Sequence, residues 1–251
     1  MPTPSSRHLK AHAAVNTPPS RNPELMRRMY TLLTKCRAPF PTLEAAYVGA
    51  LMGLLPEDTL TLSHGGPISE ILFEKDQAPE LLDFAPLDPK SPGLDAAAQI
   101  AIAAGYALDR LLRHKPGLVL AFAGEATSLA AARETLAFAA THRLPLVAVV
   151  QHNMGKLKLE KGESPQDLSH EILGAGLAGI TVDGSDAMAV YRVIQEAMYR
   201  ARHDGGPSLI ECKTCRKTSV PKHLRPWVQG DAVAYMEQQL RARNFWLEET
   251  R

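Results

Sequence analysis

Hydrophobic residues follow two different periods along the second half of this chain. Short, mainly apolar runs with the length of a buried strand occur at 118–122, 146–150, 179–182 and 208–212. Segments with apolar residues at helical spacing occur at 94–114, 128–142 and 186–203. Strands that alternate with helices of this length are typical of βαβ units. The pattern therefore predicts an α/β fold, with a mainly parallel sheet that carries helices on both faces.

Two further helices are predicted before this alternating region. Asn22 is a suitable N-cap and Pro23 fits the first helical position, after which apolar residues recur at helical spacing up to Cys36. The second helix is predicted over 42–55, where small residues such as Gly49 line one side. Because small residues let two backbones approach closely, we expect this helix to pack deep inside the fold.

The remaining segments lack periodicity. Residues 1–22 are rich in proline, with basic and hydroxyl side chains and no acidic residue. This composition predicts a disordered tail, although transit peptides have a similar composition. A signal peptide is not expected, because the segment has no apolar stretch. A single domain is expected over 23–251. Residues 77–92, rich in Pro, Asp and Leu, are predicted to form a long loop.

Composition narrows the class of protein further. The chain has 251 residues, 45% of them hydrophobic, and 28 basic against 27 acidic side chains give a net charge of +1. A nearly neutral chain has no strong positive electrostatic field to attract nucleic acid or an acidic membrane surface, so neither is expected as a partner. No apolar run is long enough to predict a transmembrane helix. With only 3 cysteines, the chain suits a reducing compartment, and we expect a cytoplasmic protein.

Two motifs resemble known sites but have simpler interpretations. The glycines of 174–179 match G-x-G-x-x-G, yet a helical segment precedes them and a strand follows, the reverse of a dinucleotide-binding fingerprint. We interpret them as a helix-to-strand connection. Cys212 and Cys215 resemble half of a zinc site, but no second pair exists, and residues three apart on a strand face opposite sides. Two unrelated thiols are expected.

Polar residues follow two of the predicted strands. Gly124, Glu125 and Ala126 come after the first apolar run, directly before a helix, and His152 and Asn153 come after the second. Open sheets bind ligands at the carboxyl ends of their strands. A glycine, a carboxylate and free N–H groups at such a turn suit a diphosphate with its Mg²⁺. The alternative is a pair of unrelated solvated loops.

At these residues the chain resembles the α subunit of thiamine-diphosphate-dependent 2-oxo acid dehydrogenases, the E1 component family that includes pyruvate and branched-chain enzymes. The similarity extends over about 23–246 and implies the thiamine-diphosphate-binding fold. Its strongest stretches are Leu144–Asn153, Gly176–Tyr191 and Gly205–Glu211 with Thr214 and Arg216, and Ala97–Ile100 is similar to the family segment beside the aminopyrimidine.

The resemblance implies a site for thiamine diphosphate and Mg²⁺. It implies metal ligation by Glu125, Asn153 and the main chain of Gly155, whereas no catalytic residue is assigned. The residues with an implied role in cofactor binding are His64, Gln99, Ile100, Gly124, Ala126 and His152. The family also implies a β-type partner subunit, an α2β2 assembly and acyl transfer to the lipoyl domain of an acyltransferase. The resemblance implies that the protein is an oxidoreductase acting on 2-oxo acids, and that it is active only with its β partner.

This sequence departs from the family at four places, one of which is the proline-rich loop that stands in place of a glycine-rich, histidine-containing segment before Gln99. Glu125 stands where the family has an aspartate, His64-Gly65 where it has a Tyr-Arg pair, and 217–220 where it has a histidine that contacts phosphate. Each lost charge-assisted contact is worth roughly 1.5–3 kcal/mol. Two alternatives therefore stand beside an E1 α-type subunit. One is a non-catalytic paralogue with weak or no cofactor binding, and the other is a different small-molecule enzyme on the same scaffold.

Overall fold

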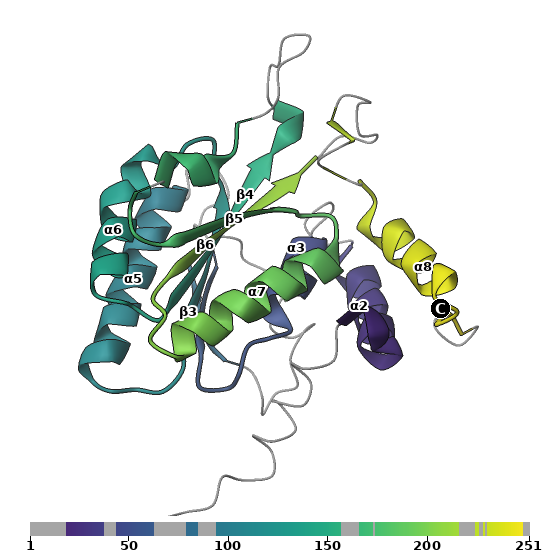
Figure 1. Ribbon diagram of the computed structural model, residues 1–251, viewed down its shortest axis with the longest axis horizontal. Helices are drawn as coiled ribbons and strands as arrows, with labels where there is room; N and C mark the ends of the chain where they lie inside the picture. The colour runs from purple at the N-terminus through teal and green to yellow at the C-terminus, as the bar shows by residue number, and fades with distance from the viewer. Residues whose placement is uncertain are drawn as a thin grey trace, which may run out of the picture.

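A parallel β-sheet forms the centre of the molecule (Figure 1). The computed structural model describes residues 19–37, 44–62, 79–84, 94–156, 166–172, 174–215, 224–225, 228 and 230–247. Within them the sheet has six strands in the order β2-β1-β3-β4-β6-β5, and each neighbouring pair is parallel. The prediction of an α/β fold with a parallel sheet is confirmed. The strands are β1 (Thr59–Leu62), β2 (Glu80–Asp83), β3 (Val119–Glu125), β4 (Leu146–Asn153), β5 (Ala178–Asp183) and β6 (Ser208–Thr214).

Helices cover both faces of this sheet, as the sequence predicted (Figure 1). Strand residues such as Phe122 and Val149 share one buried apolar cluster with helices α2, α3, α7 and α8. Residues of alternate register, such as Ala121 and Val150, pack on the other face against α5, α6 and short 3-10 helices. The helices are η1 (Pro19–Arg21), α2 (Pro23–Cys36), α3 (Glu44–Leu51), α5 (Ala96–Leu112), η3 (Ala130–Ala132), α6 (Arg133–Thr141), η4 (Met154–Lys156), η5 (Leu168–Ile172), α7 (Ala187–Arg202) and α8 (Ala232–Ala242).

The start of α2 follows the predicted capping pattern. The side chain of Asn22 accepts a hydrogen bond from the Leu25 N–H at 3.0 Å, and Pro23 occupies the first helical position. The tail expected over 1–22 is structured at its end, because 19–21 form a 3-10 helix, and 1–18 lie outside the described residues. The domain boundary at 22–23 stays a prediction.

Helix α3 is shorter than predicted but packs as expected. It ends at Leu51 rather than at residue 55, because a turn follows it. A Cβ atom added at Gly49 would lie 2.7 Å from the Ala187 carbonyl oxygen and 2.7 Å from the Cβ of Val190. The helix therefore approaches α7 so closely that only glycine fits at this point of contact.

The prediction of one long loop over 77–92 is wrong in its first part, where β2 forms an edge strand. Its side chains are mostly exposed, so the strand leaves no apolar period in the sequence, and its backbone pairing with β1 supplies the stabilising hydrogen bonds. The position of β1 in turn depends on the buried Asp58. This carboxylate accepts hydrogen bonds from the Leu55 N–H at 2.7 Å and the Leu118 N–H at 2.9 Å.

Candidate functional site

The two predicted polar groups meet at the carboxyl edge of the sheet. Strands β3 and β4 are neighbours, and Glu125 pairs in register with Gln151. The Ala126 N–H donates to the Gln151 carbonyl oxygen at 2.8 Å, and Gly124 has a φ of +75°, which glycine adopts without strain. Gln151, His152 and Asn153 lie on β4 itself and are buried. The alternative of two unrelated solvated loops is therefore wrong.

The first turns of α5 lie beside this edge. Asp95 caps the helix by accepting the Ala98 N–H at 2.7 Å, and Gln99 donates from its side chain to the Leu94 carbonyl oxygen at 2.7 Å. Ile100 belongs to the same buried apolar cluster as Ala126. The start of α5 and the end of β3, which the resemblance assigns to one cofactor site, are thus packed together.

A buried carboxylate that the sequence analysis did not single out orients His152. Glu211 on β6 is fully buried, and its Oε1 lies 2.7 Å from Nδ1 of His152. Its Oε2 accepts hydrogen bonds from the Ser169 N–H at 3.0 Å and from the Thr181 hydroxyl at 3.1 Å. Burial by itself raises the pKa of Glu211, but hydrogen bonds from His152 and from backbone N–H groups hold it below its ordinary value.

This network fixes the imidazole of His152. Because the Glu211 carboxylate is ionised and can only accept, Nδ1 of His152 carries a proton and donates it. The same carboxylate joins β4, β5, β6 and η5 at the carboxyl edge. The signal in the sequence was a carboxylate beside the apolar residues Leu209, Ile210 and Cys212, since a buried charge requires partners.

The residues that the resemblance implies as metal ligands contact other groups of the protein instead. Oε1 of Glu125 lies 2.7 Å from Nζ of Lys156, a residue that the sequence analysis did not single out. The side-chain oxygen of Asn153 accepts the Gly155 N–H at 3.1 Å. In the described parts of the chain, no group of three or more His, Cys, Asp or Glu residues is placed to hold a metal ion. Because the Glu125 carboxylate pairs with the Lys156 ammonium group, these residues in this arrangement do not fit a divalent cation.

Two of the N–H groups at the start of the helical segment after β3 have partners of their own. The carboxylate of Glu171 on η5 accepts the Leu129 N–H and, at 2.7 Å, the Ser128 hydroxyl. The Ala130 N–H donates to the Ser128 hydroxyl oxygen at 3.1 Å. At Leu129 and Ala130 the expectation of free donors is therefore wrong, because Glu171, a residue distant in sequence, and Ser128 accept their N–H groups.

The simpler interpretations of the two misleading motifs are confirmed. Gly174 and Gly176 both have a φ of +83° in the turn between η5 and β5. Cys212 and Cys215 are free thiols in two separate apolar clusters. His64, Gly65, 85–93 and 216–223 lie outside the described residues, so what the resemblance implies there stays a prediction.

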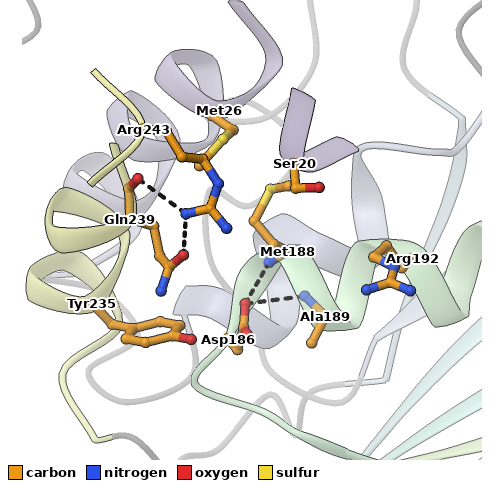
Figure 2. Close-up of a pocket in the computed structure, with 9 residues that line it drawn as sticks. All are labelled: Ser20, Met26, Asp186, Met188, Ala189, Arg192, Tyr235, Gln239 and Arg243. Carbon is orange, nitrogen blue, oxygen red and sulfur yellow. Dashed lines mark hydrogen bonds between the residues drawn. The ribbon is translucent and has the colours of Figure 1, made fainter. Parts of the chain in front are cut away.

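A separate pocket of about 140 Å³ lies between α2, α7 and α8 (Figure 2). Asp186 at the start of α7 accepts the N–H groups of Met188 and Ala189, both at 3.0 Å. Arg243 donates to the side chain and, at 3.1 Å, the carbonyl oxygen of Gln239 on the same helix. These contacts make Asp186 a helix cap, and none of the residues predicted for the cofactor site lines this pocket.

The chain is an α/β protein whose polar residues gather at the carboxyl ends of adjacent strands, which is where open parallel sheets bind ligands. A family model described as dehydrogenase E1 component matches residues 94–219, half of the chain. The chain therefore belongs to the dehydrogenase E1 component family. No helix among the described residues is long and apolar enough to cross a membrane.

Curated relatives carry names of E1 α subunits. The chain is 38% identical over 119 residues to the 3-methyl-2-oxobutanoate dehydrogenase subunit alpha of Mycobacterium tuberculosis, covering 46% of this chain and 32% of that protein. It is 32% identical over 162 residues to the pyruvate dehydrogenase E1 component subunit alpha of Staphylococcus aureus, covering 61% of this chain and 42% of that protein. The chain thus spans a third to less than half of these relatives. The comparisons support an E1 α-type chain and do not favour the non-catalytic paralogue.

A similar solved structure is that of an enzyme from Mycobacterium smegmatis described as thiamin diphosphate-dependent. It shares 19% sequence identity with this chain at a TM-score of 0.49, over 70% of this chain and 32% of the other.

Proposed function

We propose that this chain is the α-type subunit of a 2-oxo acid dehydrogenase and contributes the diphosphate side of a thiamine diphosphate site. The observation that carries the proposal is the meeting of β3, β4 and α5 at one edge of the sheet, at residues where the chain resembles its family. When bound, the cofactor supplies the carbanion chemistry that removes CO₂ from a 2-oxo acid and passes the acyl group to a lipoyl arm.

The residues proposed to hold the cofactor have suitable chemistry. Gly124 and Ala126 leave the end of β3 without bulky side chains, so a ligand can approach the backbone. Gln99 and Ile100 at the start of α5 provide a polar and an apolar contact, and His152 is held in one orientation by Glu211. His64 belongs to the proposed set on resemblance alone.

The proposed protein acts with partners. We propose a β-type subunit that completes the site, an α2β2 assembly and the lipoyl domain of an acyltransferase as acyl acceptor, all in the cytoplasm. The names of the relatives support the first of these, since they are subunits of larger enzymes. The resemblance also implies Mg²⁺ on Glu125, Asn153 and Gly155, but no step of the proposed function is assigned to the metal, because Lys156 neutralises Glu125.

Reconstitution with a β-type chain tests the proposal. We expect the mixture to bind thiamine diphosphate in a calorimetric titration and to reduce an artificial electron acceptor when a 2-oxo acid is added. A panel of pyruvate and branched-chain 2-oxo acids identifies the substrate. If neither the chain alone nor the mixture binds the cofactor, the proposed function is wrong.

A matched pair of variants tests the site itself. Gln99→Ala removes a polar group at the start of α5 and should weaken cofactor binding about threefold to tenfold, as expected for a hydrogen bond worth about 1 kcal/mol. Gln238→Ala changes an exposed residue on α8 and should leave the affinity unchanged. Equal affinities for both variants would remove α5 from the cofactor site.

A further inference from the structure

Lys156 lies at the point where the family resemblance requires a metal ion. Its Nζ is 2.7 Å from Oε1 of Glu125, so an ammonium group is paired with the carboxylate that would ligate the metal. The side chain of Lys156 is 64% exposed and that of Glu125 is 17% exposed. The ion pair therefore lies at the end of β3 with its ammonium group exposed to solvent.

The local backbone holds Lys156 in this position. Strand β4 ends at Asn153, and the 3-10 helix η4 follows at once. The Asn153 side chain accepts the Gly155 N–H at 3.1 Å, which stabilises the tight turn. This turn directs the chain so that Lys156, on the β4 side, meets Glu125 at the end of the neighbouring β3.

The charges disfavour a divalent ion beside this pair. A metal bound to Glu125 would lie within a few ångströms of the Lys156 ammonium, and the two positive charges would repel each other. An ammonium group has three N–H donors, and one of them suffices for the contact with Glu125. The others are available to phosphate oxygens, which lysine binds as a compact point charge.

We propose that Lys156 takes the place of the divalent cation, so that this chain binds the diphosphate of its cofactor without a metal ion. The proposal rests on the proposed function, since it concerns the same site. Glu125 then holds the ammonium group in position instead of ligating a metal. Asn153 stabilises the turn instead of completing a coordination shell.

Calorimetric titration of the full chain with its β-type partner, using thiamine diphosphate in EDTA and in Mg²⁺, tests this role. Wild type should bind with the same affinity in both. Lys156→Met keeps the apolar stem but removes the charge, so it should bind about tenfold or more weakly in EDTA, the loss of one charge-assisted contact. Mg²⁺ should restore this binding, because the Glu125 carboxylate no longer pairs with an ammonium group and can ligate the metal. Lys115→Met, which removes an exposed lysine paired with Asp109 at 3.0 Å, is the control and should behave as wild type.

A second readout does not depend on affinity. With thiamine diphosphate present, the electron paramagnetic resonance spectrum of Mn²⁺ should show no bound ion in wild type and a bound ion in Lys156→Met. Binding by wild type only in Mg²⁺, or equal binding by Lys156→Met and wild type in EDTA, would overturn this inference and leave the proposed function intact. Absence of binding under every condition would overturn both.

Discussion

Replacing Glu211 by alanine should destabilise this protein more than any surface substitution. The fully buried carboxylate accepts hydrogen bonds from His152, Ser169 and Thr181. The substitution leaves all three donors without this acceptor. Leaving a buried hydrogen-bonding group without its partner typically costs about 1–3 kcal/mol, and more where the lost partner is charged, so with three donors affected we expect a loss of about 3–5 kcal/mol. Glu211→Gln keeps the volume and one acceptor oxygen, so a smaller loss of about 1–3 kcal/mol is expected.

Urea denaturation followed by circular dichroism measures these losses at pH 7. The matched control is Glu196→Ala on the exposed face of α7, which should change the free energy of unfolding by less than about 0.5 kcal/mol. A double-mutant cycle with His152→Ala isolates the coupling between the two side chains. A loss below about 1 kcal/mol for Glu211→Ala would refute the argument that this carboxylate holds the edge of the sheet together.

The same residue predicts a pH dependence. The pKa of Glu211 lies below its ordinary value of 4.5 in the folded protein, so its contribution to stability is fully present above about pH 4.5. It is lost as the pH falls through the folded-state pKa. Glu211→Gln should therefore show a shallower loss of stability below pH 4.5 than wild type. Parallel curves for the two proteins would contradict this assignment.

Three further predictions concern helix packing, helix capping and buried thiols. Gly49→Ala should lower the free energy of unfolding by about 1–3 kcal/mol through overpacking. Gly105→Ala, where an added Cβ meets nothing within 4 Å, should raise it by about 0.5–1 kcal/mol. Thermal denaturation compares the two variants, and equal shifts would contradict the close contact of α3 with α7. Asp186→Ala removes the cap of α7 and should cost about 0.5–2 kcal/mol in urea denaturation, and an unchanged midpoint would exclude the cap. Burial raises the pKa of Cys36 to about 11 and of Cys212 to about 12, so iodoacetamide at pH 8 should label neither thiol until the protein is denatured; rapid labelling of the native protein would contradict their burial.

Much of the fold could be predicted from the sequence, because its signals are local. The caps at Asn22 and Asp186 and the long apolar runs of β3 and β4 lie within a few residues of the structure that they specify. The edge strand β2 left no such signal, since its side chains are mostly exposed and its pairing partner lies in β1. A strand stabilised mainly by backbone hydrogen bonds is visible only once its neighbour is in place.

The site divides in the same way. The sequence by itself determined the chemistry at the strand ends, Gly124 to Ala126 and His152 to Asn153, because ligands of parallel sheets lie at the carboxyl ends. Only the tertiary structure decided which groups are already engaged: Glu211 with His152, Glu171 with Leu129, and Lys156 with Glu125. The first two of these contacts join residues more than forty positions apart, and the third joins the ends of two strands. Such contacts depend on distance in space, which no spacing along the chain records.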